Sequence, residues 1–185
     1  MQAVKDEQLM SWLQEGDRSC LGALFERHHT ALYAFCVQLT GSRALAEDVV
    51  QEAFFRVLKK RHQYRGGQFK AWLFNIARNL AFDHLRKIGR QVNLDEAKQV
   101  GEADHRDPAR TAEGSERQAI VERALARLPI KAREVILLGR FEFEGYDALA
   151  EALDCSPGAA KVRMHRAMKQ LRELITEISR EAAYG

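Results

Sequence analysis

The most regular alternation of apolar and polar positions in the chain lies over residues 68–87. Large apolar side chains recur there at intervals of three or four residues: Phe69, Trp72, Leu73, Ile76 and Leu80. This spacing places them on one side of an α-helix. Phe74, Ala81 and Leu85 fall about a third of a turn away, so we expect other elements to pack against this helix from two directions. The pattern predicts a central helix with two buried faces.

The remaining strip of the same helix carries amides, cations and one ring, without an acid: Asn75, Arg78, Asn79, Phe82 and Arg86. Amide, guanidinium and aromatic groups together are suited to reading and stacking nucleobases. An exposed basic edge with a half-buried Phe82 is an equally good interpretation of these residues alone. The strip is therefore a candidate nucleic-acid surface.

Helical spacing of apolar residues continues on both sides of this segment. It predicts further helices over residues 6–13, 19–40, 45–60, 115–128, 131–141, 146–153 and 158–178. Residues 93–115 are rich in acids and poor in large apolar side chains, which indicates a flexible linker. We therefore expect an all-α chain interrupted by one linker.

The predicted helix over residues 45–60 also has an unusual polar side. The strip opposite its apolar stripe places one aromatic residue among acids and an amide: Asp48, Gln51, Glu52 and Phe55. An exposed ring surrounded by polar groups is typical of a protein-binding patch. The alternative is that Phe55 covers a small secondary core.

A basic segment with two glycines, residues 61–67, connects these two helices. It contains His62, Tyr64 and Arg65, whose rings and charge are suited to holding a flipped-out base against the backbone. A plain connector is the alternative, because glycines are ordinary loop residues.

The last two predicted helices are separated by a tight turn in which Ser156 can cap and Pro157 can occupy the first helical position. The longer helix buries one side and leaves the other basic: Lys161, His165, Arg166, Lys169 and Arg172, with no acid before Glu173. A short helix, a turn and a basic helix match a helix-turn-helix, whose second helix enters the major groove of DNA. Val162 lies toward the basic side, where it can contact a thymine methyl. The alternative is an ordinary solvated charged face.

Composition narrows the class of protein. The 185 residues are 46% hydrophobic and 30% charged, as in folded proteins. The net charge of +3 is too small to establish a nucleic-acid partner, so the local distribution of charge must decide. Cys20, Cys36 and Cys155 are far apart and form no disulfide or zinc pattern, which favours reduced thiols.

Several function classes receive no support from the sequence. The first ten residues have no apolar segment typical of a signal peptide, and no long apolar run follows, so we expect a cytoplasmic protein. His28, His29 and Cys36 have no metal-ligand spacing, and no phosphate loop or nucleophile motif is present. We expect no enzymatic activity, no metal or other cofactor, and no small-molecule substrate.

The chain resembles the extracytoplasmic-function (ECF) class of bacterial RNA polymerase sigma factors, in the sigma-70 family. The resemblance lies in AEDVVQEAFFRV followed by FKAWLFNIARNLAFDHLRK, and, after the acidic linker, in LPIKAREVILLGRFEFEGYDALAEALDCSPGAAKVRMHRAMKQLRE. It implies two small helical domains. Sigma domain 2, a helical bundle, would span residues 1–90, and sigma domain 4, the helix-turn-helix, would span residues 115–185 after a linker over 91–114.

The resemblance also assigns roles to the candidate surfaces. It implies that the domains bind the clamp helices and flap of core RNA polymerase, the clamp-helix contact being made by Asp48, Gln51, Glu52 and Phe55. It implies that the promoter minus 10 element is melted and captured by His62, Tyr64, Arg65, Asn75, Arg78, Asn79, Phe82 and Arg86. It implies that the minus 35 element is read as duplex by Lys161, Val162, Arg163, His165, Arg166 and Lys169.

Three positions of the last helix depart from the family pattern. Ala159, Val162 and Met168 stand where relatives usually have threonine, serine and arginine. The loss of two hydroxyls removes possible hydrogen bonds to phosphates or bases. We therefore expect that the promoter sequence does not transfer from relatives.

Three hypotheses follow. The first is a non-enzymatic sigma factor controlled by an anti-sigma protein that covers both domains, an arrangement that the linker would permit. The second is a stand-alone helix-turn-helix regulator whose N-terminal helices sense a ligand or dimerise. The third is a metal hydrolase using His28, His29 and Cys36, which no motif supports.

Overall fold

The structure is a computed structural model that describes residues 4–92, 112–140, 143 and 145–184. These residues form helices joined by short turns, and none of them lies in a strand. The helices are α1 (Asp6–Glu15), α2 (Ser19–Thr40), α3 (Arg43–Lys60), the short 3-10 helix η1 (Arg61–Gln63), α4 (Phe69–Val92), α5 (Ala112–Arg127), α6 (Ile130–Gly139), α7 (Gly145–Leu153) and α8 (Pro157–Tyr184). The prediction of an all-α fold is confirmed.

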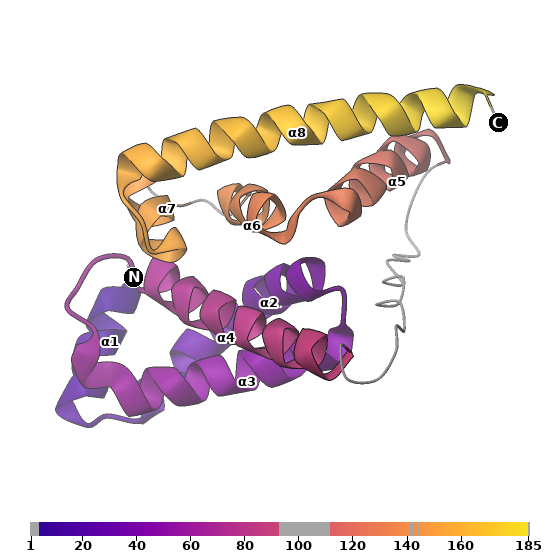
Figure 1. The fold of residues 1–185 in the computed structure, drawn as a ribbon. Coiled ribbons are helices and arrows are strands. Elements are labelled where there is room, and N and C mark those ends of the chain that lie inside the picture. The colour runs from indigo at the N-terminus through magenta and orange to yellow at the C-terminus, as the bar shows by residue number, and fades with distance from the viewer. Residues whose placement is uncertain (1–3, 93–111, 141–142, 144, 185) are drawn as a thin grey trace.

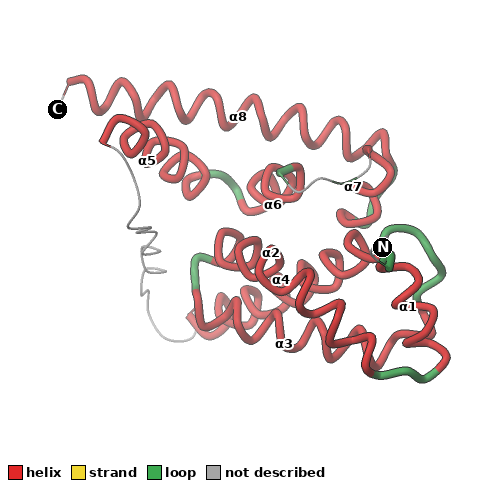
Figure 2. Tube along the Cα trace, turned by 180° about the vertical axis from the view of Figure 1, so that it is seen from behind, coloured by secondary structure: helices red, strands yellow, loops and turns green. Residues whose placement is uncertain are grey.

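The first four helices form a bundle in which α4 packs against α1, α2 and α3 (Figure 2). The α4 side chains that are fully or almost fully buried come from both predicted faces: Phe69, Leu73, Phe74, Leu80 and Ala81. Burial of a Phe or Leu side chain stabilises a fold by about 1.5–3 kcal/mol, so these contacts hold α4 firmly. The prediction of a doubly packed central helix is confirmed.

Three helix boundaries differ from those predicted by three residues or more. α4 continues past Gly89 to Val92, because Gly89 does not adopt the left-handed conformation with which Gly16 and Gly41 end α1 and α2. α5 begins at Ala112, ahead of Ser115, the predicted cap. α8 extends to Tyr184 rather than to residue 178. The predicted linker is thus helical at both ends, and its remainder, residues 93–111, lies outside the described residues.

The C-terminal helices form a second packed unit in which the long α8 contacts α5, α6 and α7. α7 and α8 are joined by a turn at Asp154–Ser156, where Asp154 has a left-handed φ of 52°. The Ser156 hydroxyl accepts a hydrogen bond from the Ala159 backbone amide at 3.2 Å, and Pro157 is the first residue of α8. The structure therefore has the helix, turn and second helix of the predicted helix-turn-helix.

The two units touch. Figure 1 shows α6 and α7 between α8 and the N-terminal bundle, and both helices contact that bundle, α6 through α2 and α7 through α4. At one end of the interface the Arg140 guanidinium donates to Gln38 Oε1 at 3.3 Å. Nearby, the rings of Phe74 and Phe143 meet edge to face with centroids 5.9 Å apart. The C-terminal unit therefore covers part of the surface of α4.

A partly buried polar contact connects α1 to α2. The imidazole Nε2 of buried His28 lies 2.6 Å from Asp6 Oδ2, and the Arg27 guanidinium donates to Asp6 Oδ1 at 2.7 Å. Burial acts to raise the pKa of Asp6, but the hydrogen bonds from His28 and Arg27 outweigh it and leave the pKa below its ordinary 3.8. His28 is thus a packed core residue. Within the described residues no group of three or more His, Cys, Asp or Glu side chains is placed to hold a metal ion.

We expect Asp6→Asn to lower the free energy of unfolding at neutral pH by about 1 to 2 kcal/mol, because it weakens charge-assisted hydrogen bonds. Since folding lowers the pKa of Asp6, its stabilisation is complete above pH 3.8 and is lost as the pH falls through the lower folded-state value. Urea unfolding should therefore separate wild type from variant at pH 7 and bring them together in stronger acid. Glu26→Gln, an exposed change on α2, is the control and should have little effect at either pH. An equal difference at both pH values would contradict the assignment.

None of the helices within the described ranges is long and apolar enough to cross a membrane.

Candidate nucleic-acid and protein interfaces

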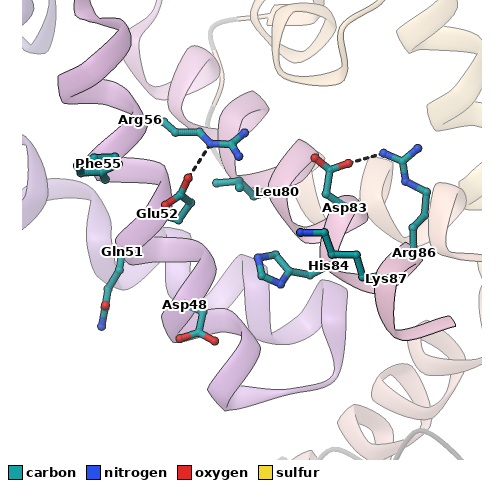
Figure 3. A pocket seen from close by; sticks show the side chains of 10 residues that line it. All are labelled: Asp48, Gln51, Glu52, Phe55, Arg56, Leu80, Asp83, His84, Arg86 and Lys87. Atoms are coloured by element: carbon teal, nitrogen blue, oxygen red, sulfur yellow. Dashed lines mark hydrogen bonds and ion pairs between the residues drawn. The ribbon is translucent and has the colours of Figure 1, made fainter. Parts of the chain in front are cut away.

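The polar side of α3 and the facing part of α4 border a surface hollow of about 830 Å³ (Figure 3). Its α3 side consists of the predicted protein-binding patch with one neighbour: Asp48, Gln51, Glu52, Phe55 and Arg56. Phe55 is 58% exposed, the largest fraction for a large apolar side chain among the described residues. It therefore does not cover a secondary core, and the alternative interpretation of this residue is wrong.

Charges on both helices frame this hollow. Glu52 Oε1 accepts from Arg56 Nε at 2.9 Å, and Asp83 pairs with Arg86 on the α4 side (Figure 3). Both pairs are short-range contacts within one helix and remain partly or largely accessible to solvent, so each is worth only a few tenths of a kcal/mol, about 0.3–0.5. A partner with a cationic surface can therefore replace these ion pairs by its own contacts to the carboxylates at a small cost in free energy. The arrangement of an exposed ring beside carboxylates suits a protein partner.

The loop over residues 61–67 is held in one conformation. The Gln14 amide donates to the carbonyls of Arg61 at 2.7 Å and Tyr64 at 2.9 Å, and the Tyr64 hydroxyl donates to Gly67 O at 2.5 Å. Gly66 and Gly67 have φ of 94° and 84°, conformations that favour glycine. The loop is thus a shaped element rather than a plain connector.

Tyr64 does not lie where a base-stacking residue would. Its ring is buried against Phe69 and Trp72, with centroids 6.4 Å and 5.3 Å away. Burial, together with the charges of Glu7, Glu151 and Asp6, raises its pKa to about 12. The predicted direct contact of this ring with DNA is therefore not possible in this structure, because the ring is packed against the aromatic side chains of α4. His62 and Arg65 are exposed.

The amide and cation strip of α4 is brought together as predicted, but the C-terminal unit covers part of it. The Asn75 amide donates to the carbonyls of Glu151 at 3.1 Å and Ala152 at 3.3 Å, in the last turn of α7. The Asn79 amide donates to Asn75 Oδ1 at 3.1 Å, and the Arg78 guanidinium donates to Asn79 Oδ1 at 3.1 Å. These polar groups thus form one connected network.

Arg78 and Phe82 meet α6. Arg78 is 8% exposed, and its Nε donates to Glu134 Oε1. Lys131 Nζ lies 3.8 Å from the centroid of the Phe82 ring. The central carbon of the Arg78 guanidinium lies 5.7 Å from the same centroid. Asn79 and Arg86 stay exposed at the edge of the contact. Sequence reasoning missed Glu134 and Lys131, since nothing local marks either as a partner of α4.

The basic side of α8 is fully accessible. All the residues that the resemblance assigned to duplex reading are exposed: Lys161, Val162, Arg163, His165, Arg166 and Lys169. On the opposite side Ala160, Ala167 and Leu171 are buried, so packing fixes which side faces outward. The exposed side begins one turn into α8, where a recognition helix contacts base edges.

Comparison with known protein families assigns both units. Residues 24–91 match the family described as sigma-70 region 2, and residues 118–171 match sigma-70 region 4. The chain is 32% identical to the RNA polymerase sigma factor CarQ of Myxococcus xanthus over 180 residues, which are 94% of this chain and 99% of that protein. It is 30% identical to the ECF RNA polymerase sigma factor SigE of Mycolicibacterium smegmatis over 91% of this chain and 67% of that protein.

A solved structure shares the fold. The sigma factor RpoE of Bartonella quintana, crystallised with the anti-sigma factor NepR, has a TM-score of 0.70 to this chain at 29% identity. The match covers 84% of this chain and 96% of that one. Together, the two family matches, the relatives and the shared fold confirm the resemblance that the sequence blocks carried, and the chain belongs to the ECF class of sigma-70 family RNA polymerase sigma factors.

Proposed function

We propose that this protein binds bacterial core RNA polymerase, recognises promoter DNA and starts transcription, without enzymatic activity of its own. The observation that carries the proposal is the presence of three chemically different surfaces on one chain. They are the exposed Phe55 patch, the amide and cation strip of α4, and the basic side of α8. A single-strand reader needs amides and rings beside cations, and a duplex reader needs a basic helix in the groove.

The two units divide these tasks. Residues 1–90 bind the clamp helices of the largest polymerase subunit and capture the minus 10 element. Residues 115–185 contact the flap and read the minus 35 element, with residues 91–114 as the connection. The matches to regions 2 and 4 of the sigma-70 family fall within these limits, apart from residue 91. This role agrees with the expectation of a cytoplasmic protein that needs no cofactor.

The buried Tyr64 changes its proposed part in minus 10 recognition. Tyr64 stabilises the conformation of the loop through its hydrogen bond to Gly67. The direct contacts with DNA are then made by His62 and Arg65, which are exposed. In α4, Asn75, Arg78, Asn79, Phe82 and Arg86 keep the proposed role in capturing bases and phosphates.

An anti-sigma protein that holds both units is the proposed regulator. The B. quintana relative in the shared fold was crystallised with such a protein. A pulldown from extract of the source cells should return both core polymerase and a small inhibitory protein. Recovery of polymerase alone, under conditions where the regulated genes are silent, would contradict this part of the proposal.

Assembly with core polymerase tests the proposed function directly. We expect the protein to co-elute with bacterial core RNA polymerase in size-exclusion chromatography and to give the polymerase affinity for promoter-containing DNA. Separate elution at concentrations where other sigma factors bind would contradict it.

Lys161→Ala tests the duplex-reading side of α8. We expect weaker binding of duplex promoter DNA by the holoenzyme, and a plot of log affinity against log salt whose slope is shallower by about 1, because one phosphate contact is lost. Arg180→Ala removes a cation from the distal part of the same helix and should leave both quantities unchanged. An unchanged salt slope for Lys161→Ala would remove this residue from the interface.

A further inference from the structure

The contact between the strip of α4 and helices α6 and α7 involves the same groups that are proposed to bind single-stranded DNA. This inference therefore rests on the proposed function. The contact extends along α4, with Lys70 5.6 Å from the centroid of the Phe143 ring at one end and Phe82 beside Lys131 at the other. All of these partners belong to the same chain.

The centre of the contact is an ion pair between Arg78 and Glu134. Glu134 is 1% exposed, and its second oxygen, Oε2, lies 3.4 Å from Lys131 Nζ, within ion-pair distance. Buried carboxylates need a cationic or hydrogen-bonding partner, and the partner of Glu134 Oε1 comes from the other unit. A carboxylate and a DNA phosphate each carry one negative charge and accept hydrogen bonds from a guanidinium, so Glu134 can occupy Arg78 in place of a phosphate.

In two further contacts, oxygen atoms of α7 also occupy positions where groups of DNA are proposed to bind. Carbonyl oxygens of Glu151 and Ala152 accept from the Asn75 amide, as the acceptor atoms of a base would. The Glu151 carboxylate lies against the loop of residues 61–67, so close that a β-carbon on Gly67 would be 3.1 Å from its Oε2. The C-terminal unit thus presents two carboxylates and two carbonyls to the candidate single-strand surface.

We infer that α6 and α7 are an intramolecular competitor of promoter DNA, in which Glu134 occupies Arg78 and keeps the minus 10 surface closed until the two units separate. The closed form blocks one DNA surface only. The basic side of α8 has no part in this contact and is exposed in the same structure. Closure therefore suppresses single-strand capture while duplex binding by α8 remains possible.

The consequence for affinity follows from mass action. DNA that binds only the open form has an apparent dissociation constant equal to the intrinsic one divided by the open fraction. Removing one partner of a buried ion pair leaves the other charge uncompensated and strongly disfavours the closed form. We expect Glu134→Gln to raise the ratio of open to closed chains on the order of 100-fold or more.

The test uses the full chain with Glu134→Gln, Arg78→Gln and the double variant. Small-angle X-ray scattering gives the radius of gyration, and fluorescence anisotropy gives the affinity for a labelled single strand and a labelled duplex, both of mixed sequence. We expect Glu134→Gln to increase the radius of gyration and tighten single-strand binding, with duplex binding unchanged. Arg78→Gln should increase the radius of gyration equally but weaken single-strand binding. The double variant should open no further than either single variant, since both remove the same contact.

Glu173→Gln on α8 is the matched control, because it removes the same charge from an exposed position outside the contact. It should match wild type in all three measurements, which separates loss of a specific contact from a change in net charge. Circular dichroism checks that every variant is folded. Because Arg78→Gln opens the contact from the other side, a folding defect in one variant does not remove the test.

Two results would overturn the inference. An unchanged radius of gyration in both Glu134→Gln and Arg78→Gln would show that the ion pair does not hold the units together. Opening without tighter single-strand binding would show that α6 and α7 do not compete with DNA. Failure of the proposed function is recognised separately, since wild-type protein would then give no promoter-specific transcripts with core polymerase.

Discussion

Phe55→Ala should weaken the association of this protein with core RNA polymerase by about 30-fold or more, corresponding to at least 2 kcal/mol. This large effect is expected because the Phe55 ring is exposed. It is 58% exposed in a hollow framed by Asp48 and Glu52, so it contributes little to the fold and offers most of its surface to a partner. Aromatic anchors of this kind carry a large share of binding energy at protein interfaces. Titration of labelled protein with core polymerase measures the effect.

The thermal unfolding of Phe55→Ala should stay close to that of wild type, because an exposed ring is removed without a cavity. Val121→Ala is the matched control, since Val121 is also an exposed apolar residue but lies on α5, away from the hollow. It should bind polymerase normally. If both variants bound core polymerase like wild type, the patch on α3 would not be the polymerase-binding surface.

Asn79→Ala should slow promoter opening by about 10- to 100-fold, since a bidentate amide contact to a base is worth about 1–3 kcal/mol. Asn79 is exposed at the edge of the strip and linked through Asn75 and Arg78 to the groups proposed to hold the displaced strand. The change should appear in the rate of permanganate-sensitive open-complex formation, while polymerase binding is unchanged. Gln8→Ala, an exposed amide on α1, is the control. Normal opening by Asn79→Ala would remove the strip of α4 from the minus 10 interface.

The helices and their buried sides were predictable because apolar spacing is encoded locally. The two faces of α4, the caps at Gly16 and Gly41, and the turn before Pro157 all depend on neighbours within a few residues. Helix ends were less predictable. Gly89 carries a typical stop signal, but a glycine inside a helix costs only about 1 kcal/mol, which other contacts can offset.

The covered state of the candidate DNA surface was not predictable, because it depends on distant pairs. Glu134 stands between Arg133 and Val135 like an ordinary surface acid, and its buried partner, Arg78, lies 56 residues earlier in the chain. Tyr64 was expected to face DNA, but Gln14, 50 residues before it, fixes the loop so that its ring points into the core. The sequence located these surfaces through residue type and spacing, whereas their accessibility is a property of tertiary packing.

Run-off transcription from fragmented genomic DNA of the source organism, with bacterial core RNA polymerase in the presence or absence of this protein, tests the central claim most directly. The account predicts new transcripts with defined starts, whose upstream sequences share one minus 10 and one minus 35 element. The absence of new transcripts, together with specific duplex binding by the protein alone, would contradict it and favour a stand-alone helix-turn-helix regulator.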